Sequence, residues 1–155
     1  MKKFELTTDT KMFLGKKLFR IKALISFGNV RAGDMGGYVE KEENLSHLNE
    51  AWVYGDAWVS GNAEVSCNAK VSGNAKVSGD ADYATASGFG SEYRTTTFFK
   101  LKNSDEIGVR CGCFYGTLKE FKEKVKETHG ETKKAKEYLM LADLMEYRFS
   151  EEKKA

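Results

Sequence analysis

The stretch from residue 93 to residue 110 collects side chains suited to holding a phosphate-bearing ligand. It offers an aromatic ring, hydroxyl groups and cations, carried by Tyr93, Arg94, Thr95, Thr96, Thr97, Lys100 and Arg110. An aromatic ring stacks on a nucleobase, and a guanidinium group binds phosphate through two parallel hydrogen bonds. These residues therefore predict a nucleotide-type ligand site. The alternative is a polar β-hairpin surface whose threonines serve strand propensity.

Cys111 and Cys113 are the next residues with reactive side chains. Tetrahedral zinc takes four ligands and usually uses cysteines separated by about two to four residues. The chain has three cysteines and no second pair to complete such a site. Residues two apart on a strand point to the same face, so both thiols are predicted to be small buried side chains. The cysteine usage fits a reducing cytoplasm.

The chain has two histidines, and each has an ordinary structural explanation. His47 falls on an inward-facing position of a repeat, and His129 falls at a helix end, where it can meet the last carbonyl groups. The glycine pair Gly36–Gly37 matches neither a Walker motif nor a dinucleotide fingerprint, so a turn is predicted there, with a phosphate cradle as the alternative. No catalytic residue, metal site or cofactor is predicted.

A six-residue repeat must position these groups. From Val53 the chain reads VYGDAW, VSGNAE, VSCNAK, VSGNAK and VSGDAD, followed by YATASG and a weaker FGSEYR. Alternation of the form Ala-x-Val predicts a short strand with one inward face, and Gly-Asn or Gly-Asp predicts a tight corner. Left-handed backbone angles are expected at the Asn and Asp of each corner, from Asp56 to Asp80.

These repeats resemble the hexapeptide-repeat family, over Val53 to about Gly88. The resemblance implies a left-handed parallel β-helix with three units to a coil, and it implies a homotrimer. Such coils would stack Val53 on Val71 and Phe89, Val59 on Val77, and His47 on Val65. Trp52 and Trp58 then point outward near Tyr54, and these three residues form a predicted interface. Aromatic rings there need cover from the N-terminal segment or another subunit.

The expected fold is mostly β and has three parts. An N-terminal β-rich cap occupies residues 1–44, the left-handed β-helix occupies residues 45–92, and a β-hairpin with a C-terminal helical pair occupies residues 93–155. The hairpin strands are predicted over 95–101 and 107–114. Capping signals at Thr117 and Thr132 start the two helices. An apolar stripe marks the buried face of the second: Ala135, Tyr138, Ala142, Met145 and Phe149.

Overall charge sets limits on function. Lys and Arg total 25 against 23 Asp and Glu, so any charged site must be local and no nucleic-acid surface is indicated. No stretch reaches the roughly 20 apolar residues of a membrane span, and no signal peptide is recognised. We therefore expect a cytoplasmic protein without a membrane partner.

Nearly the whole chain is also similar to small uncharacterised hexapeptide-repeat proteins of bacteriophages and prophages. That resemblance implies a phage-encoded, non-enzymatic, homotrimeric binding protein that acts against host defence, in one form by sequestering a signalling nucleotide. One alternative is an inhibitor that binds a host defence protein directly through Trp52 and Trp58, in the manner of anti-CRISPR proteins. Others are a hexapeptide acyltransferase that uses His47 and a structural protein of the virion.

Overall fold

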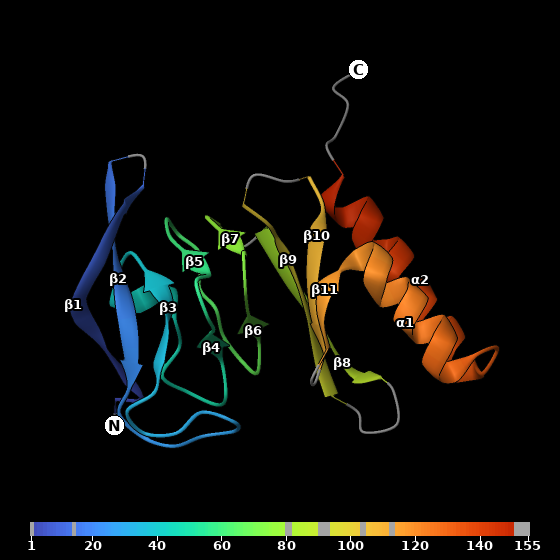
Figure 1. Cartoon of the computed structure of the whole chain (residues 1–155), viewed down its shortest axis with the longest axis horizontal. Helices are drawn as coiled ribbons and strands as arrows, with labels where there is room; N and C mark the ends of the chain where they lie inside the picture. Colours follow the sequence, from blue (N-terminus) through green and yellow to red (C-terminus); the bar gives the residue numbers. More distant parts are fainter. Residues whose placement is uncertain are drawn as a thin grey trace.

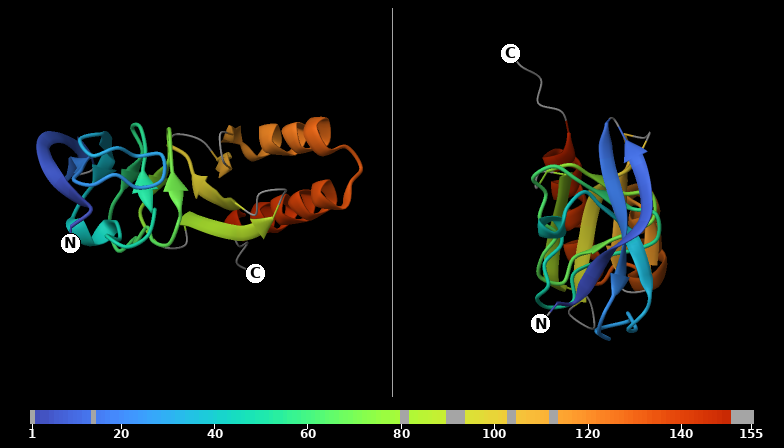
Figure 2. Two further views of the ribbon diagram at one scale, coloured as in Figure 1. Left: turned by 90° about the horizontal axis from the view of Figure 1, so that it is seen from below. Right: turned by 90° about the vertical axis from the view of Figure 1, so that its left-hand side faces the viewer.

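The fold is mostly β, with two helices at the C-terminal end (Figure 1). The structure is a computed structural model, and it describes residues 2–13, 15–79, 82–89, 94–102, 105–111 and 114–150. Along the long axis of the molecule, the N-terminal strands lie at one end, the repeats in the middle and the helices at the other end (Figures 1 and 2).

A five-stranded sheet joins the N-terminal segment to the repeats. β1 (Phe4–Phe13), β2 (Lys16–Ala23) and β3 (Met35–Val39) pair antiparallel, and β5 (Trp58–Val59) and β7 (Lys76–Val77) continue the sheet in parallel. The register aligns Val39, Val59 and Val77, all fully buried. Because a buried apolar row continues from β3 into the repeats, the N-terminal segment and the repeats share one core.

The glycine pair Gly36–Gly37 lies within β3, so the predicted turn is wrong at these two residues. A Cβ atom on Gly36 would come within 2.6 Å of the carbonyl oxygen of Val53, and one on Gly37 within 2.6 Å of that of Ala57. The two glycines therefore allow β3 to approach the backbone of the repeats closely.

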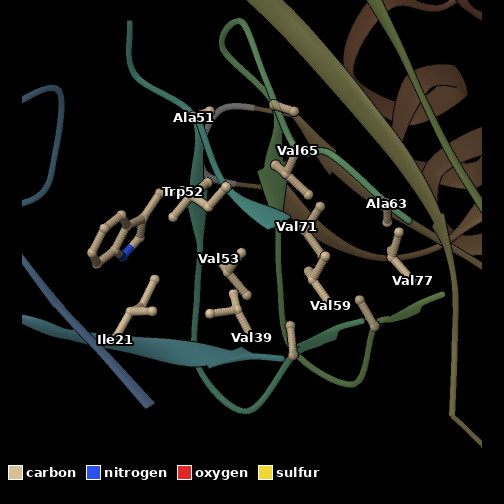
Figure 3. Packing of buried hydrophobic residues seen from close by; sticks show 14 of the residues in the cluster. Ile21, Val39, Ala51, Trp52, Val53, Val59, Ala63, Val65, Val71 and Val77 are labelled. Carbon is tan, nitrogen blue, oxygen red and sulfur yellow. The ribbon is translucent and has the colours of Figure 1, made fainter. Parts of the chain in front are cut away.

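Successive repeats belong to three different sets of parallel pairings. β4 (Trp52–Val53) pairs with β6 (Lys70–Val71), β5 pairs with β7, and Leu45 forms a bridge with Val65. The predicted stacking of Val53 on Val71 and of Val59 on Val77 is observed. Figure 3 shows these valines and Val65 gathered between the ribbons, where each is fully buried.

Two details of the repeats differ from expectation. Leu45, rather than His47, pairs with Val65, because the segment before the repeats is longer than a strict six-residue spacing allows. The left-handed backbone angles fall one residue earlier than predicted, with φ of 61° at Gly55, 62° at Gly61, 57° at Cys67 and 61° at Gly73. Glycine adopts this conformation without strain, so three of these four corners use the glycine that precedes Asn or Asp, and Cys67 occupies the same position in the fourth.

The last repeats leave the coil. β8 (Tyr83–Phe89) pairs antiparallel with β9 (Arg94–Lys100), followed by β10 (Ile107–Cys111) and β11 (Phe114–Thr117) in the order β11-β10-β9-β8. Phe89 therefore pairs with Arg94 and does not stack on Val71. These units lack the Gly-Asn corner, so nothing turns the chain into another coil. The predicted strand 107–114 is divided between β10 and β11.

This four-stranded sheet separates the repeats from the helices (Figure 1). Alternate residues of β9 point to opposite faces, so Phe99 joins the core of the repeats and Phe98 joins the core under the helices. The sheet also satisfies the backbone of the last coil. The Thr97 hydroxyl accepts a hydrogen bond from Lys70 N (2.9 Å), and the Tyr115 hydroxyl accepts one from Asn74 N (3.0 Å).

The two helices begin where the capping residues predict. α1 (Leu118–His129) begins after Thr117, whose capping box with Glu120 is complete, and α2 (Lys133–Phe149) begins after Thr132. The predicted stripe on α2 packs against the sheet and α1, with Ala135, Tyr138, Ala142 and Met145 buried. Among the described residues, neither helix is long and apolar enough to cross a membrane.

Candidate functional site

The described residues of the predicted ligand segment point in different directions. Thr96 and Thr97 are fully buried, on opposite faces of β9. The Thr96 hydroxyl donates to Cys111 Sγ (3.2 Å), whereas Thr97 bonds to the last coil. The Thr95 and Ser87 hydroxyls share a hydrogen bond of 2.8 Å. These hydroxyl groups are therefore used within the fold.

The cations of the same segment also have partners. Lys100 Nζ lies 3.2 Å from Asp82 Oδ1. Arg110 lies over the Tyr54 ring, with its Cζ 5.0 Å from the ring centre and its Nη1 3.5 Å from Ser72 Oγ. Tyr93 and the Arg94 side chain lie outside the described residues. Ligand binding on this segment stays a prediction.

Trp52 belongs to the core. Its side chain is 1% exposed and packs edge-on against Phe4 and Phe27, with ring centres 6.3 and 5.3 Å away. Figure 3 shows the Trp52 ring beside Ile21, on the far side of its strand from the valines. The N-terminal segment thus supplies the cover that this ring requires. Tyr54 is half-buried beneath Arg110, and burial raises the pKa of its hydroxyl.

His47 and Cys111 take part in packing. The His47 ring stacks on Phe4 with ring centres 4.2 Å apart, its Nδ1 accepts from Lys3 N (3.0 Å), and its Nε2 lies 2.9 Å from Glu42 Oε1. Cys111 is partly buried beneath α2, as predicted, and Cys113 lies outside the described residues. Within the described ranges, no three His, Cys, Asp or Glu side chains are grouped to hold a metal ion.

A different set of residues does converge, on the outer face of the five-stranded sheet. Register pairs place Arg20 beside Tyr38, Tyr38 beside Trp58, and Trp58 beside Lys76. The alternate positions of β3, β5 and β7 carry buried valines, so this row points away from the core. Four neighbouring strands therefore carry a row in which two aromatic rings lie between two cations, and the Tyr38 ring is only 2% exposed.

Side chains from both flanks complete this row. Phe13 of β1 packs on Trp58 with ring centres 4.6 Å apart, and Lys76 Nζ lies 4.6 Å from the Phe13 ring centre. Lys102, which follows β9, places its Nζ 3.7 Å from the Trp58 ring centre. Lys11 Nζ lies 5.0 Å from the Tyr38 ring centre. We call the following six residues the cation–aromatic surface: Lys11, Phe13, Tyr38, Trp58, Lys76 and Lys102.

Arg20 differs from the lysines of this surface because carboxylates already balance its charge. Its Nε lies 3.1 Å from Asp9 Oδ2 and its Nη2 lies 3.2 Å from Asp56 Oδ1, while it also donates to the Tyr38 hydroxyl. Among the described residues, no carboxylate lies within ion-pair distance of Lys11, Lys76 or Lys102. Lys102 Nζ donates instead to the backbone oxygen of Asp56 (2.6 Å), and the Asp56 carboxylate also stabilises its ammonium form.

Two further properties distinguish this surface. The pKa of Lys102 is lowered to about 8, chiefly because burial disfavours its ammonium form and also because the charge of Lys11 lies nearby, with Asp56 acting in the opposite direction. Among the residues that the structure describes, the buried indole Nε1 of Trp58 has no hydrogen-bond acceptor.

Only part of this site could be predicted from the sequence. The outward column that runs from Trp58 to Lys76 follows from the repeat spacing. Lys11, Phe13 and Lys102 come from flanking segments whose positions depend on the folded hairpin and on the sheet that covers the last coil. No local motif marks these three residues.

Neither the scan against protein-family models nor the search of curated proteins finds a match to this chain.

Proposed function

We propose that this chain is a non-enzymatic binding protein whose cation–aromatic surface takes a phosphate-bearing ligand of the nucleotide class. The observation that carries the proposal is the convergence of three lysine ammonium groups on neighbouring aromatic rings, with no carboxylate of the described residues within ion-pair distance of them. Phosphate oxygens would neutralise Lys11, Lys76 and Lys102 together. The rings of Phe13 and Trp58 hold the Lys76 and Lys102 ammonium groups close together.

The proposal is consistent with the charge of the whole chain. A net charge of +2 gives no general attraction for polyanions, so recognition must come from a local cluster. One chain supplies all six residues of the surface. The site therefore does not depend on a subunit boundary.

The repeats support a more specific description of the scaffold. We infer that residues 45–79 form a left-handed parallel β-helix, on the strength of the resemblance to hexapeptide repeats and of parallel pairs such as Val53 with Val71. The resemblance to small phage proteins supports a role against host defence. In that role, the ligand would be a signalling nucleotide that the protein sequesters.

Charge reversal on the surface should weaken nucleotide binding. With ATP as the probe, we expect Lys76→Glu and Lys11→Glu each to raise the Kd about tenfold or more in isothermal titration calorimetry, since each removes one ammonium–phosphate contact. Lys100→Glu is the matched control, because Lys100 lies on the 93–110 segment and pairs with Asp82. If only Lys100→Glu lost ATP binding, the ligand site would lie on the 93–110 segment and not on the cation–aromatic surface. Absence of any ATP binding by the wild type would refute the proposal.

Nucleotide affinity should also depend on pH through Lys102. Because its pKa is about 8, the ammonium form is lost in the free protein as the pH rises through that value, so ATP should bind more weakly at about pH 9.5 than at about pH 7.5. Lys102→Arg keeps the charge throughout this range and should flatten the profile. Calorimetry at several pH values measures the effect. If ATP affinity fell equally with pH in the wild type and in Lys102→Arg, Lys102 would not contact the ligand.

A further inference from the structure

The exposed face of α2 carries a concentration of apolar side chains. Met140, Leu144 and Tyr147 are 71%, 57% and 72% exposed and follow one another at spacings of four and three residues. They therefore form one stripe along the helix. The stripe lies opposite the side of α2 that packs on the sheet. Asp143, which pairs with Lys122 of α1, borders the stripe three residues after Met140.

Charged residues lie at both ends of this stripe, and their order lets one copy of α2 pair with a second, antiparallel copy. Glu137 precedes it by three residues and Arg148 closes it, so opposite charges lie at its two ends. In an antiparallel pair of α2 helices centred near Ala142, Met140 would lie opposite Leu144 of the second copy. Glu137 would then lie opposite Tyr147 and Arg148 of the second copy. The two-fold arrangement repeats each contact, which is the property of an isologous interface.

Space for such a contact exists beside the helix. Leu144 and Arg148 line an open groove of about 460 Å³ between α2 and β8, together with Tyr83 and Thr85. β8 is also the edge strand of its sheet. An apolar stripe next to an open groove gives a second helix room to approach, whereas a lone exposed residue would not.

We propose that α2 is a dimerisation surface, and that its partner is α2 of a second copy of this chain, packed antiparallel. Charge complementarity selects this partner, because the helix supplies both members of each Glu137–Arg148 pair. The surface lies at the opposite end of the molecule from the β1–β2 hairpin (Figures 1 and 2), so the proposal is independent of ligand binding at the cation–aromatic surface.

Analytical ultracentrifugation over a range of concentrations tests this proposal. The wild type should reach twice the monomer mass, and Leu144→Glu should stay monomeric. Glu137→Arg and Arg148→Glu should each raise the dimer dissociation constant about tenfold, because each places like charges opposite one another. The double variant Glu137→Arg/Arg148→Glu should restore dimerisation, which a merely misfolded single variant would not do.

The control is Leu48→Glu, which charges an apolar side chain that is 71% exposed outside α2. It should leave the dimer unchanged, and circular dichroism should show that all variants keep the fold. A wild type that is monomeric at every concentration, a trimer, or a dimer that survives Leu144→Glu would each overturn the proposal. ATP binding should be the same in Leu144→Glu as in the wild type, which separates this result from the outcome for the ligand site.

Discussion

Replacing Trp52 with alanine should lower the free energy of unfolding by about 3–5 kcal/mol, the usual cost of truncating a large buried aromatic side chain. Trp52 is 1% exposed and joins the N-terminal segment to the repeats through Phe4 and Phe27. Its removal leaves a cavity between two parts of the chain that cannot easily collapse. Urea unfolding followed by circular dichroism measures the change.

The control for Trp52→Ala is Leu48→Ala, which truncates an exposed apolar side chain. It should change the free energy of unfolding by less than about 0.5 kcal/mol. The result also separates two roles for Trp52. If Trp52→Ala kept its stability but changed the oligomeric mass, Trp52 would be an interface residue and its assignment to the core would be wrong.

Gly61→Ala should cost about 3 kcal/mol or more, the second large effect that we expect. Gly61 has a φ of 62°, a left-handed conformation that costs other residues about 1–2 kcal/mol. The added Cβ would also lie 2.3 Å from the carbonyl oxygen of Ser78 in the next coil. This oxygen belongs to the backbone and cannot move aside as a side chain could, so the two neighbouring coils must separate to make room for the Cβ atom. Thermal and urea unfolding report the loss.

Cys67 provides a matched comparison for Gly61. It occupies the glycine position of the next repeat, with a φ of 57°, and its side chain is exposed. Cys67→Gly relieves the left-handed strain without removing a packed group, so it should raise the free energy of unfolding by about 1 kcal/mol. A tolerated Gly61→Ala, or a destabilising Cys67→Gly, would contradict this account of the corners.

The regular part of the fold could be predicted because its residues recur in register. Val53 with Val71 and Val59 with Val77 follow directly from the six-residue period. The exit of the chain at Tyr83 could not be predicted, because it depends on the competing pairing of β8 with β9. The helices began as predicted since their capping residues act locally.

The candidate site was less accessible to sequence reasoning. Clustered hydroxyls and cations at 93–110 suggested a ligand site, yet alternation along β9 sends Thr96 and Thr97 to opposite faces. The cation–aromatic surface joins Lys11, Trp58 and Lys102, which are far apart in the chain. Only the register of the sheet and the cover over the last coil bring them together.

The most direct test of the proposed ligand site uses the two tryptophans as reporters. In ¹⁵N-labelled protein, each indole gives one Nε1–H signal, assigned with Trp52→Phe and Trp58→Phe. On titration with ATP, the Trp58 signal should shift and saturate, because the Trp58 ring lies within the cation–aromatic surface, while the Trp52 signal should stay in place because Trp52 belongs to the core. A Trp58 signal that does not move while ATP binds would place the ligand elsewhere and contradict the account.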